Sequence, residues 1–218
     1  MTIFHKALEY LGKNNQDIFI LNIGAMDGVM FDPLIQYIKK YHWNGLYVEP
    51  IECYFNTLKS NIKNGIFENS AISDYDGSID MTIIDKDIID QKLVSSFFYG
   101  MSAINPPKNG LARNHEIVKK YGKTTKVQCI TYQTLLQKHN LTNKNIDIIK
   151  IDTEGHDYTV FKQINIELNN TKAIMLEWIN LNNDEKTNTL TEFQKYNFRT
   201  EFHDGNIVAI SPSLQHIL

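Results

Sequence analysis

Short apolar runs alternate with amphipathic segments along most of this 218-residue chain. Five runs have the length and composition of buried strands: residues 17–23, 45–49, 66–72, 146–151 and 173–178. Helical spacing precedes or follows them at about 3–11, 31–41, 51–64, 157–164 and 184–196. Repeated strand–helix units predict a mostly parallel sheet with helices on both faces.

The two ends of the chain carry further local signals. Gly12 is expected to end the first helix. Near the C-terminus, two strand-like segments, 198–203 and 207–210, flank the turn signal Asp204, Gly205 and Asn206. This pattern predicts a β-hairpin that adds an antiparallel strand to the sheet.

The middle of the chain loses the strand–helix rhythm. We expect strands at 78–84, 95–99 and 126–130, an irregular loop at 100–111 and a helix at 113–121. Thr131 is a suitable N-cap for a helix that runs to about His139. No linker or repeat sets this region apart. We therefore interpret 1–218 as a single domain in which about 74–130 is an inserted or elaborated segment.

A glycine turn follows the first apolar run. Gly24 and Gly28 have the spacing G-x-x-x-G, and Met30 stands where a third glycine would complete a dinucleotide fingerprint. The second apolar run ends in Glu49, 21 residues after Gly28. A carboxylate at this place can accept hydrogen bonds from ribose hydroxyls. The pattern predicts an adenosine-containing cofactor and disfavours NAD.

A second polar group follows the later strands. Asp152, Glu154, His156 and Asp157 come directly after the run 146–151, and Glu177 lies at the end of the run 173–178. Acids at the tips of apolar strands are unfavourable unless they are paired or functional, because burial of an unpaired charge is costly. Ligands of open α/β sheets bind beyond the carboxyl ends of the strands. We therefore expect one site shared with the glycine turn.

Composition excludes some classes of protein. The net charge of −3 and a pI near 6.2 argue against a nucleic-acid binder. No uncharged apolar run reaches the roughly 18 residues of a membrane span, and the N-terminus lacks a signal-peptide core. A cytoplasmic location is the expectation. The oligomeric state is not indicated.

Five strings in this order carry a resemblance to a known family: LNIGAMDG, LYVEP, NSAISDYDG, IDIIKIDTEGHD and IMLEW. Together they resemble the FkbM-type S-adenosylmethionine-dependent methyltransferases over residues 17–210, with KIDTEGHD as the most specific part. The resemblance implies a Rossmann-like class I methyltransferase fold. That fold has a mostly parallel seven-stranded sheet with an antiparallel C-terminal hairpin strand.

The resemblance also implies the donor side of the site. The residues placed against S-adenosylmethionine are Asn22, Gly24, Ala25, Asp27, Gly28, Glu49, Ser70, Ala71, Ile72 and Asp152. In this set the glycine turn lies against the methionine part, with Asp27 near its amino end. Glu49 binds the ribose, and residues 70–72 line the adenine. Asn22 and Ser70 depart from the acids that many class I methyltransferases carry there.

On the acceptor side, Asp152 is the first candidate for a general base, followed by His156 and Glu154. Asp152 could instead cap a helix, His156 could be structural, and Lys150 is expected to pair with a carboxylate. A less favoured alternative is a divalent metal bound by Asp152, Glu154, His156 and Glu177. The default expectation is no metal.

The expected reaction is O-methylation of a hydroxyl on a sugar, glycan or secondary metabolite. N-methylation, a non-catalytic cofactor-binding module and a metal-dependent hydrolase are the alternatives. The inserted segment is expected to shape the acceptor site. Its candidate contacts are Tyr99, Met101, Asn105, Arg113, His115 and Tyr121. Lys119, Lys120, Lys123 and Lys126 form either a phosphate-binding group or a solvated helix face.

Overall fold

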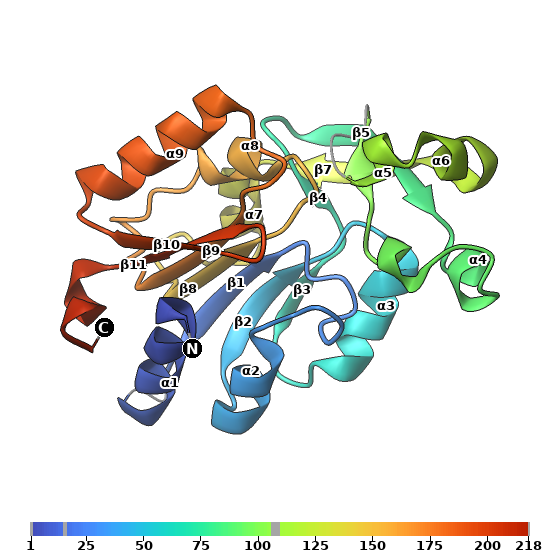
Figure 1. The fold of residues 1–218 in the computed structure, drawn as a ribbon. Helices are drawn as coiled ribbons and strands as arrows, with labels where there is room; N and C mark the ends of the chain where they lie inside the picture. Colours follow the sequence, from blue (N-terminus) through green and yellow to red (C-terminus); the bar gives the residue numbers. More distant parts are fainter. Residues whose placement is uncertain (1, 15–16, 106–109, 218) are drawn as a thin grey trace.

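The computed structural model describes residues 2–14, 17–105 and 110–217. Its larger sheet has seven strands in the order β10-β11-β9-β8-β1-β2-β3 (Figure 1). Their bounds are β1 Phe19–Ile23, β2 Asn44–Val48, β3 Ile66–Glu68, β8 Ile148–Ile151, β9 Ala173–Glu177, β10 Arg199–His203 and β11 Asn206–Ile210. In this sheet β11 alone runs in the direction opposite to the other six strands. The predicted class I methyltransferase fold, including the hairpin, is confirmed.

Helices cover both faces of this sheet (Figure 1). One layer holds α1 Ile3–Asn14, α2 Ile35–Tyr41 and α3 Glu52–Asn61, and the other holds α7 Tyr132–Lys138, α8 Asp157–Phe161 and α9 Asn183–Lys195. Strand β1 shows why both layers are needed: Ile20 packs into the first core, whereas Leu21 and Ile23 pack into the second. Strands buried on both faces are continuously apolar, which explains the runs in the sequence.

Two predicted helix boundaries differ from the structure. Helix α1 continues through Gly12, where an added Cβ would lie 2.2 Å from the ring of Tyr41. The glycine therefore permits close contact between helices and does not end one. Helix α2 begins at Ile35, after a turn in which the Asp32 side chain accepts a hydrogen bond from the Leu34 amide.

The predicted strand 66–72 is wrong, because it divides between two sheets. β3 ends at Glu68, and β4 Ala71–Ile72 begins a four-stranded sheet of order β4-β7-β5-β6. Between them, the Asn69 amide donates to the Glu49 carbonyl oxygen at 2.8 Å, which fixes the chain as it leaves the first sheet. The other strands are β5 Gly77–Ile84, β6 Ala103–Ile104 and β7 Gly122–Ile130.

Short helices complete this second sheet: α4 Lys86–Asp90, α5 Gly110–Arg113 and α6 His115–Tyr121. The predicted strand 95–99 is instead the 3₁₀ helix η1 Ser96–Phe98, capped by the Ser95 side chain, which accepts from the Phe97 amide. The predicted loop 100–111 contains β6 and the start of α5, and its residues 106–109 lie outside the described part. The Thr131 cap of α7 is present as expected.

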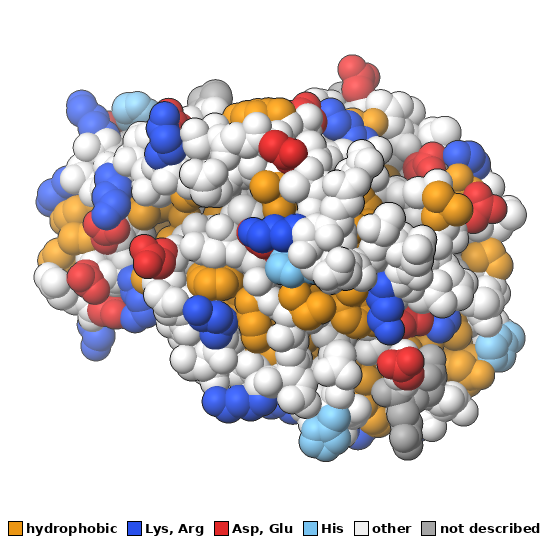
Figure 2. Space-filling view, turned by 180° about the vertical axis from the view of Figure 1, so that it is seen from behind, with side chains coloured by type: hydrophobic (Ala, Val, Ile, Leu, Met, Phe, Trp, Pro, Cys, Tyr) orange, Lys and Arg blue, Asp and Glu red, His pale blue; other side chains and the backbone are white. Residues whose placement is uncertain are grey.

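The surface carries mixed charge on the face drawn in Figure 2, where Lys and Arg side chains are interspersed with Asp and Glu. A second 3₁₀ helix, η2 Pro212–Ile217, ends the described chain and packs its Leu214 into the α1 and α2 layer. Within residues 2–14, 17–105 and 110–217, no helix combines the length and apolar character needed to cross a membrane.

Candidate active site

A cavity of about 430 Å³ opens at the carboxyl ends of β1, β2, β8 and β9. The strand order reverses between β1 and β8, which is where open α/β sheets bind their ligands. The walls of the cavity contain Gly24 from the glycine turn, Glu49, and Asp152 with the loop that follows it. Met81 and Ile104 of the second sheet close the other side. Polar segments far apart in the sequence therefore meet in one place.

The glycine turn is wedged between β2 and β8. Gly24 has φ +77°, and an added Cβ would lie 1.8 Å from the Asp152 carbonyl oxygen. The amides of Gly24 and Ala25 both donate to the Val48 carbonyl at 3.0 Å. Only glycine combines this backbone conformation with this approach. The residue thus fixes the spacing between the turn and the Asp152 loop.

Three residues expected on the donor side do not line the cavity. Gly28 packs against Leu58 of α3, and Asp27 Oδ1 accepts from the amides of Val29 and Met30. Asn22 is fully buried and donates to Asp32 Oδ2 at 2.6 Å. These residues build the turn instead of facing a ligand.

Glu49 lies at the tip of β2, and its carboxylate faces the cavity. Its oxygens accept from the amides of Met26 at 2.9 Å and Ile51 at 2.8 Å. Burial raises the pKa of Glu49 to about 7, although these two hydrogen bonds oppose the shift. The carboxylate is thus rigidly held, with lone pairs left to accept from a diol.

The adenine side, as the resemblance implied it, is an apolar wall. Ser70, Ala71 and Ile72 line the cavity at the start of β4, and Met81 of β5 and Ile104 of β6 lie on the same lining. Flat apolar rings are favoured in a slot of this composition. The second sheet therefore supplies part of the wall that the sequence placed on one strand.

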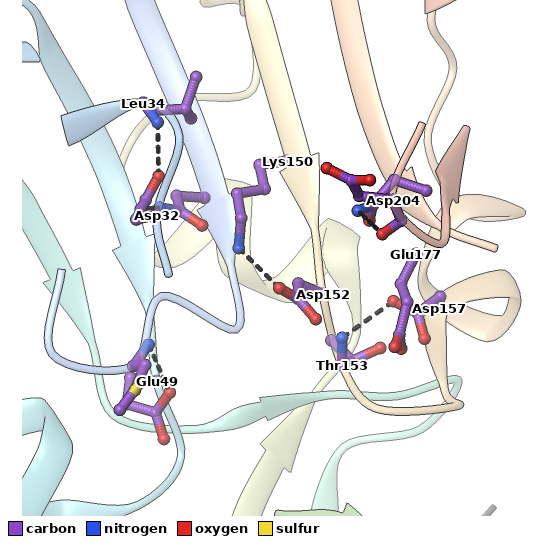
Figure 3. A network of polar contacts seen from close by, with 12 residues as sticks. Asp32, Leu34, Glu49, Lys150, Asp152, Thr153, Asp157, Glu177 and Asp204 are labelled. Atoms are coloured by element: carbon purple, nitrogen blue, oxygen red, sulfur yellow. Dashed lines mark hydrogen bonds and ion pairs between the residues drawn. The ribbon is translucent and has the colours of Figure 1, made fainter. Parts of the chain in front are cut away.

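Asp157 organises the loop after β8. Its fully buried carboxylate accepts from the amide of Thr153 at 2.9 Å (Figure 3). It also accepts from the amide of Gly155 at 2.9 Å. Glu154 between them has φ +57°, a conformation that costs a non-glycine residue about 1–2 kcal/mol. Burial, followed by the nearby Asp152 charge, raises the pKa of Asp157 to about 6. This residue holds the candidate catalytic groups in place.

Carboxylate oxygens of Asp152, Glu154 and Glu177 lie within 4.8 Å of one another. Among the described residues, His156 is not part of this group, so the four-residue metal set is reduced to three carboxylates. The His156 ring lines the cavity, and its Nε2 lies 3.3 Å from Ser73 Oγ. The trio could bind a divalent cation or share protons.

Residues 22–204 match the Methyltransferase FkbM domain. The chain belongs to the FkbM methyltransferase family. This membership supports methyltransferase activity and implies S-adenosylmethionine as the methyl donor. No curated protein sequence matches the chain. Among solved structures, a chain from a crystal structure of a fibrillarin–Nop5p complex is 12% identical, with a TM-score of 0.45, over 90% of this chain and 73% of that chain.

Residues 74–130 line the cavity mostly through residues other than those expected. Tyr99 and Met101 line the cavity, whereas Asn105, Arg113, His115 and Tyr121 do not. The lysines are also elsewhere: Lys123 pairs with Asp85, Lys126 approaches Asp80, and Lys119 and Lys120 border a separate shallow depression. The solvated-face interpretation of the lysines agrees with these positions.

Sequence reasoning missed Asp32 as a cavity residue and Asp157 as the support of the loop. Asp32 lies ten residues beyond β1's Asn22 in an irregular turn, and only its position before Pro33 marked it as a turn former. Asp157 was interpreted as the first residue of a helix. The expected pairing of Lys150 is present, with Nζ 3.1 Å from Asp152 Oδ2.

Glu177 gives this FkbM domain a pH-dependent stability. Burial raises the pKa of Glu177 to about 9, and the charges of Asp157, Glu154 and Asp152 add to the effect. Between the unfolded pKa of about 4.5 and this value, the native carboxyl keeps a proton that the unfolded chain has lost. This contribution to stability is therefore complete at low pH and is lost as pH rises through about 9.

We expect the melting temperature of the Glu177→Gln variant to fall less steeply between pH 6 and 9 than that of wild type. Each pH unit over which one proton separates the two states changes the unfolding free energy by about 1.4 kcal/mol. Thermal melts of the ligand-free protein across this range measure the slope. Glu192→Gln is the control, because this partly exposed acid of α9 does not line the cavity, and it should follow wild type. Parallel curves for Glu177→Gln and wild type would contradict the assignment.

Proposed function

We propose that this protein is an S-adenosylmethionine-dependent O-methyltransferase acting on a hydroxyl of a small molecule, sugar or glycan. The observation that carries the proposal is the cavity itself. It places the buried Glu49 carboxylate and an apolar wall on one side, and the Asp152–His156 loop on the other. An adenosine group and a proton acceptor can therefore face the same space.

The donor side fits the cofactor by the chemistry of its residues. Glu49 is held by two backbone amides, so its carboxylate needs no reorganisation to receive two ribose hydroxyls. Ala71, Ile72 and Met81 provide an apolar surface for a base. Gly24 and Ala25 keep side chains small where the turn meets the cavity. None of these donor-side residues indicates a site for the second nucleotide that NAD carries.

When bound, the cofactor would supply an electrophilic sulfonium methyl group, and its transfer to a hydroxyl would require a base that takes the hydroxyl proton. Asp152 is the proposed base, because its carboxylate lines the cavity beside the glycine turn. The ion pair with Lys150 occupies one oxygen and leaves the other to accept the proton. His156 is the second candidate, and Glu154 the third.

The acceptor side is acidic and apolar. Carboxylates of Asp152, Glu154, Glu177 and Asp204 line it, and the exposed side chains of Phe31, Phe97 and Ile179 border the opening. This composition favours an acceptor without phosphate or carboxylate groups. An amine would also suit such a wall, so N-methylation is the alternative function. NMR of a product carrying a labelled methyl group distinguishes the two.

Calorimetry with S-adenosylmethionine, S-adenosylhomocysteine and NAD tests the donor assignment. We expect both adenosyl compounds to bind at micromolar or lower concentrations and NAD not to bind. Absence of binding by both adenosyl compounds would refute the proposed function. Binding without methylation of any hydroxyl or amine acceptor would favour the non-catalytic module, and loss of turnover on chelation would add a metal at the carboxylate trio.

A further inference from the structure

Most backbone donors of the glycine turn are already engaged. Gly24 and Ala25 donate to Val48 O, Met26 donates to Glu49, Gly28 donates to Ala25 O, and Val29 and Met30 donate to Asp27. A helix or turn that binds an anion does so with unpaired amides. These amides are paired, so an anionic group at this end of the cavity needs another donor.

Lys150 supplies a charged donor. It is 4% exposed, and among the described residues that line the cavity it is the single lysine or arginine. An ammonium has three N–H donors, and the hydrogen bond from Lys150 to Asp152 Oδ2 uses one of them. Figure 3 shows Lys150 on β8 with its amine between Asp32 and Asp152.

Asp32 provides the opposite charge in the same part of the cavity. It is 8% exposed, and its two oxygens accept from the amide of Leu34 and the side chain of Asn22. Burial raises the pKa of Asp32, and the attraction to Lys150 opposes this shift. Asn22 therefore has a role that the sequence did not reveal, because it orients the Asp32 carboxylate.

We propose that Lys150 and Asp32 bind the amino-acid end of S-adenosylmethionine, with the lysine ammonium on the cofactor carboxylate and the aspartate on the cofactor α-ammonium. The inference rests on the proposed function and deepens it. A zwitterion adds one charge of each sign, so this oppositely charged pair receives it without burying a net charge. Asp27, the residue first expected here, faces the turn amides instead.

Three ligands separate the two contacts by calorimetry. S-adenosylhomocysteine has both charged groups, its decarboxylated analogue keeps only the amine, and 5′-methylthioadenosine has neither. Lys150→Met should lower the affinity for S-adenosylhomocysteine by about 10- to 100-fold and leave the affinities for the other two ligands unchanged. Asp32→Asn should lower the affinities for S-adenosylhomocysteine and the amine analogue by a similar factor. The affinity for 5′-methylthioadenosine should again be unchanged.

Equal losses for all three ligands, or no loss for any, would overturn the proposal. If wild type binds none of them, the proposed function fails instead, so the two failures are distinguishable. Lys172→Met is the matched control. It also removes a lysine that pairs with a buried acid, since Lys172 Nζ lies 2.6 Å from Asp147 Oδ1, but this pair does not line the cavity. It should bind all three ligands as wild type does.

Loss of the buried Lys150 charge could unfold the protein, which thermal melts would detect. In that case the Asp32→Asn variant carries the test, because an asparagine oxygen still accepts from the Leu34 amide. A loss that is equal for the amine analogue and 5′-methylthioadenosine in this variant would refute the contact to the α-ammonium.

Discussion

Asp152→Asn is expected to lower turnover by about 10²- to 10⁴-fold, the range contributed by a general base. Asparagine has the same shape, and its amide oxygen still accepts from Lys150, which lies 3.1 Å from Asp152 Oδ2 in wild type. The variant keeps the shape and this contact, and loses the negative charge and with it the capacity to take a proton. Binding of S-adenosylhomocysteine should therefore change far less than turnover.

Methyl transfer from labelled cofactor, together with calorimetry of S-adenosylhomocysteine, measures the two quantities separately. Asp80→Asn is the control, because this exposed acid of β5 lies near Lys126 and does not line the cavity. Its turnover should equal that of wild type. Retention of turnover by Asp152→Asn would remove Asp152 from the catalytic role and leave His156 as the next residue to replace.

Gly24→Ala is expected to destabilise the protein by about 2–5 kcal/mol and to abolish cofactor binding. A left-handed backbone costs alanine about 1–2 kcal/mol, and overpacking adds about 1–3 kcal/mol. The overpacking is severe because the new Cβ would lie 1.8 Å from the Asp152 carbonyl oxygen, a backbone atom. Relief of this contact must separate the glycine turn from the Asp152 loop.

Gly205→Ala isolates the contact from the conformational strain. Gly205 has φ +79°, close to the +77° of Gly24, yet the nearest atoms to its added Cβ are those of Ile179 at 3.7 Å. Urea denaturation should show a loss of only about 1–2 kcal/mol for this variant. Equal destabilisation of the two variants would mean that the approach to Asp152 does not constrain the turn.

The fold was predictable from sequence where one local pattern decides the structure. Strand β1 is apolar on both faces because helices cover both, and the Asp204–Gly205 turn defines the terminal hairpin. The second sheet was not predictable as a unit. Its strands pair through distant contacts, such as Ala71 beside Cys129, which no local pattern encodes.

The errors have particular physical causes. Side-chain hydrogen bonds from Asn69 to the carbonyl oxygens of Glu49 and Pro50 are found where the predicted strand 66–72 divides. Gly12 resembles a helix stop, yet it is required by the nearby ring of Tyr41. In both cases a tertiary contact overrides the local preference. The sequence shows Asn69 and Gly12 themselves, but it does not show which residues they contact in the fold.

The residues of the candidate site also divide into those that a local pattern predicts and those that depend on a tertiary contact. Glu49, Asp152 and His156 were expected in one cavity because they follow apolar strands, and strand ends of a parallel sheet converge. Asp32 follows no strand, so no periodic pattern places it. Its position depends on a hydrogen bond from Asn22, a buried residue whose partner only the structure identifies.

The passage of the chain between the two sheets has a consequence for ligand binding. Ala71 and Ile72 belong to the four-stranded sheet but line the wall proposed for the adenine. Two ligands whose affinities both depend on the separation of the sheets must change each other's affinity by the same factor, since coupling free energies are reciprocal. Any coupling between acceptor and cofactor through this wall is therefore expected to be mutual, each ligand changing the dissociation constant of the other by the same factor.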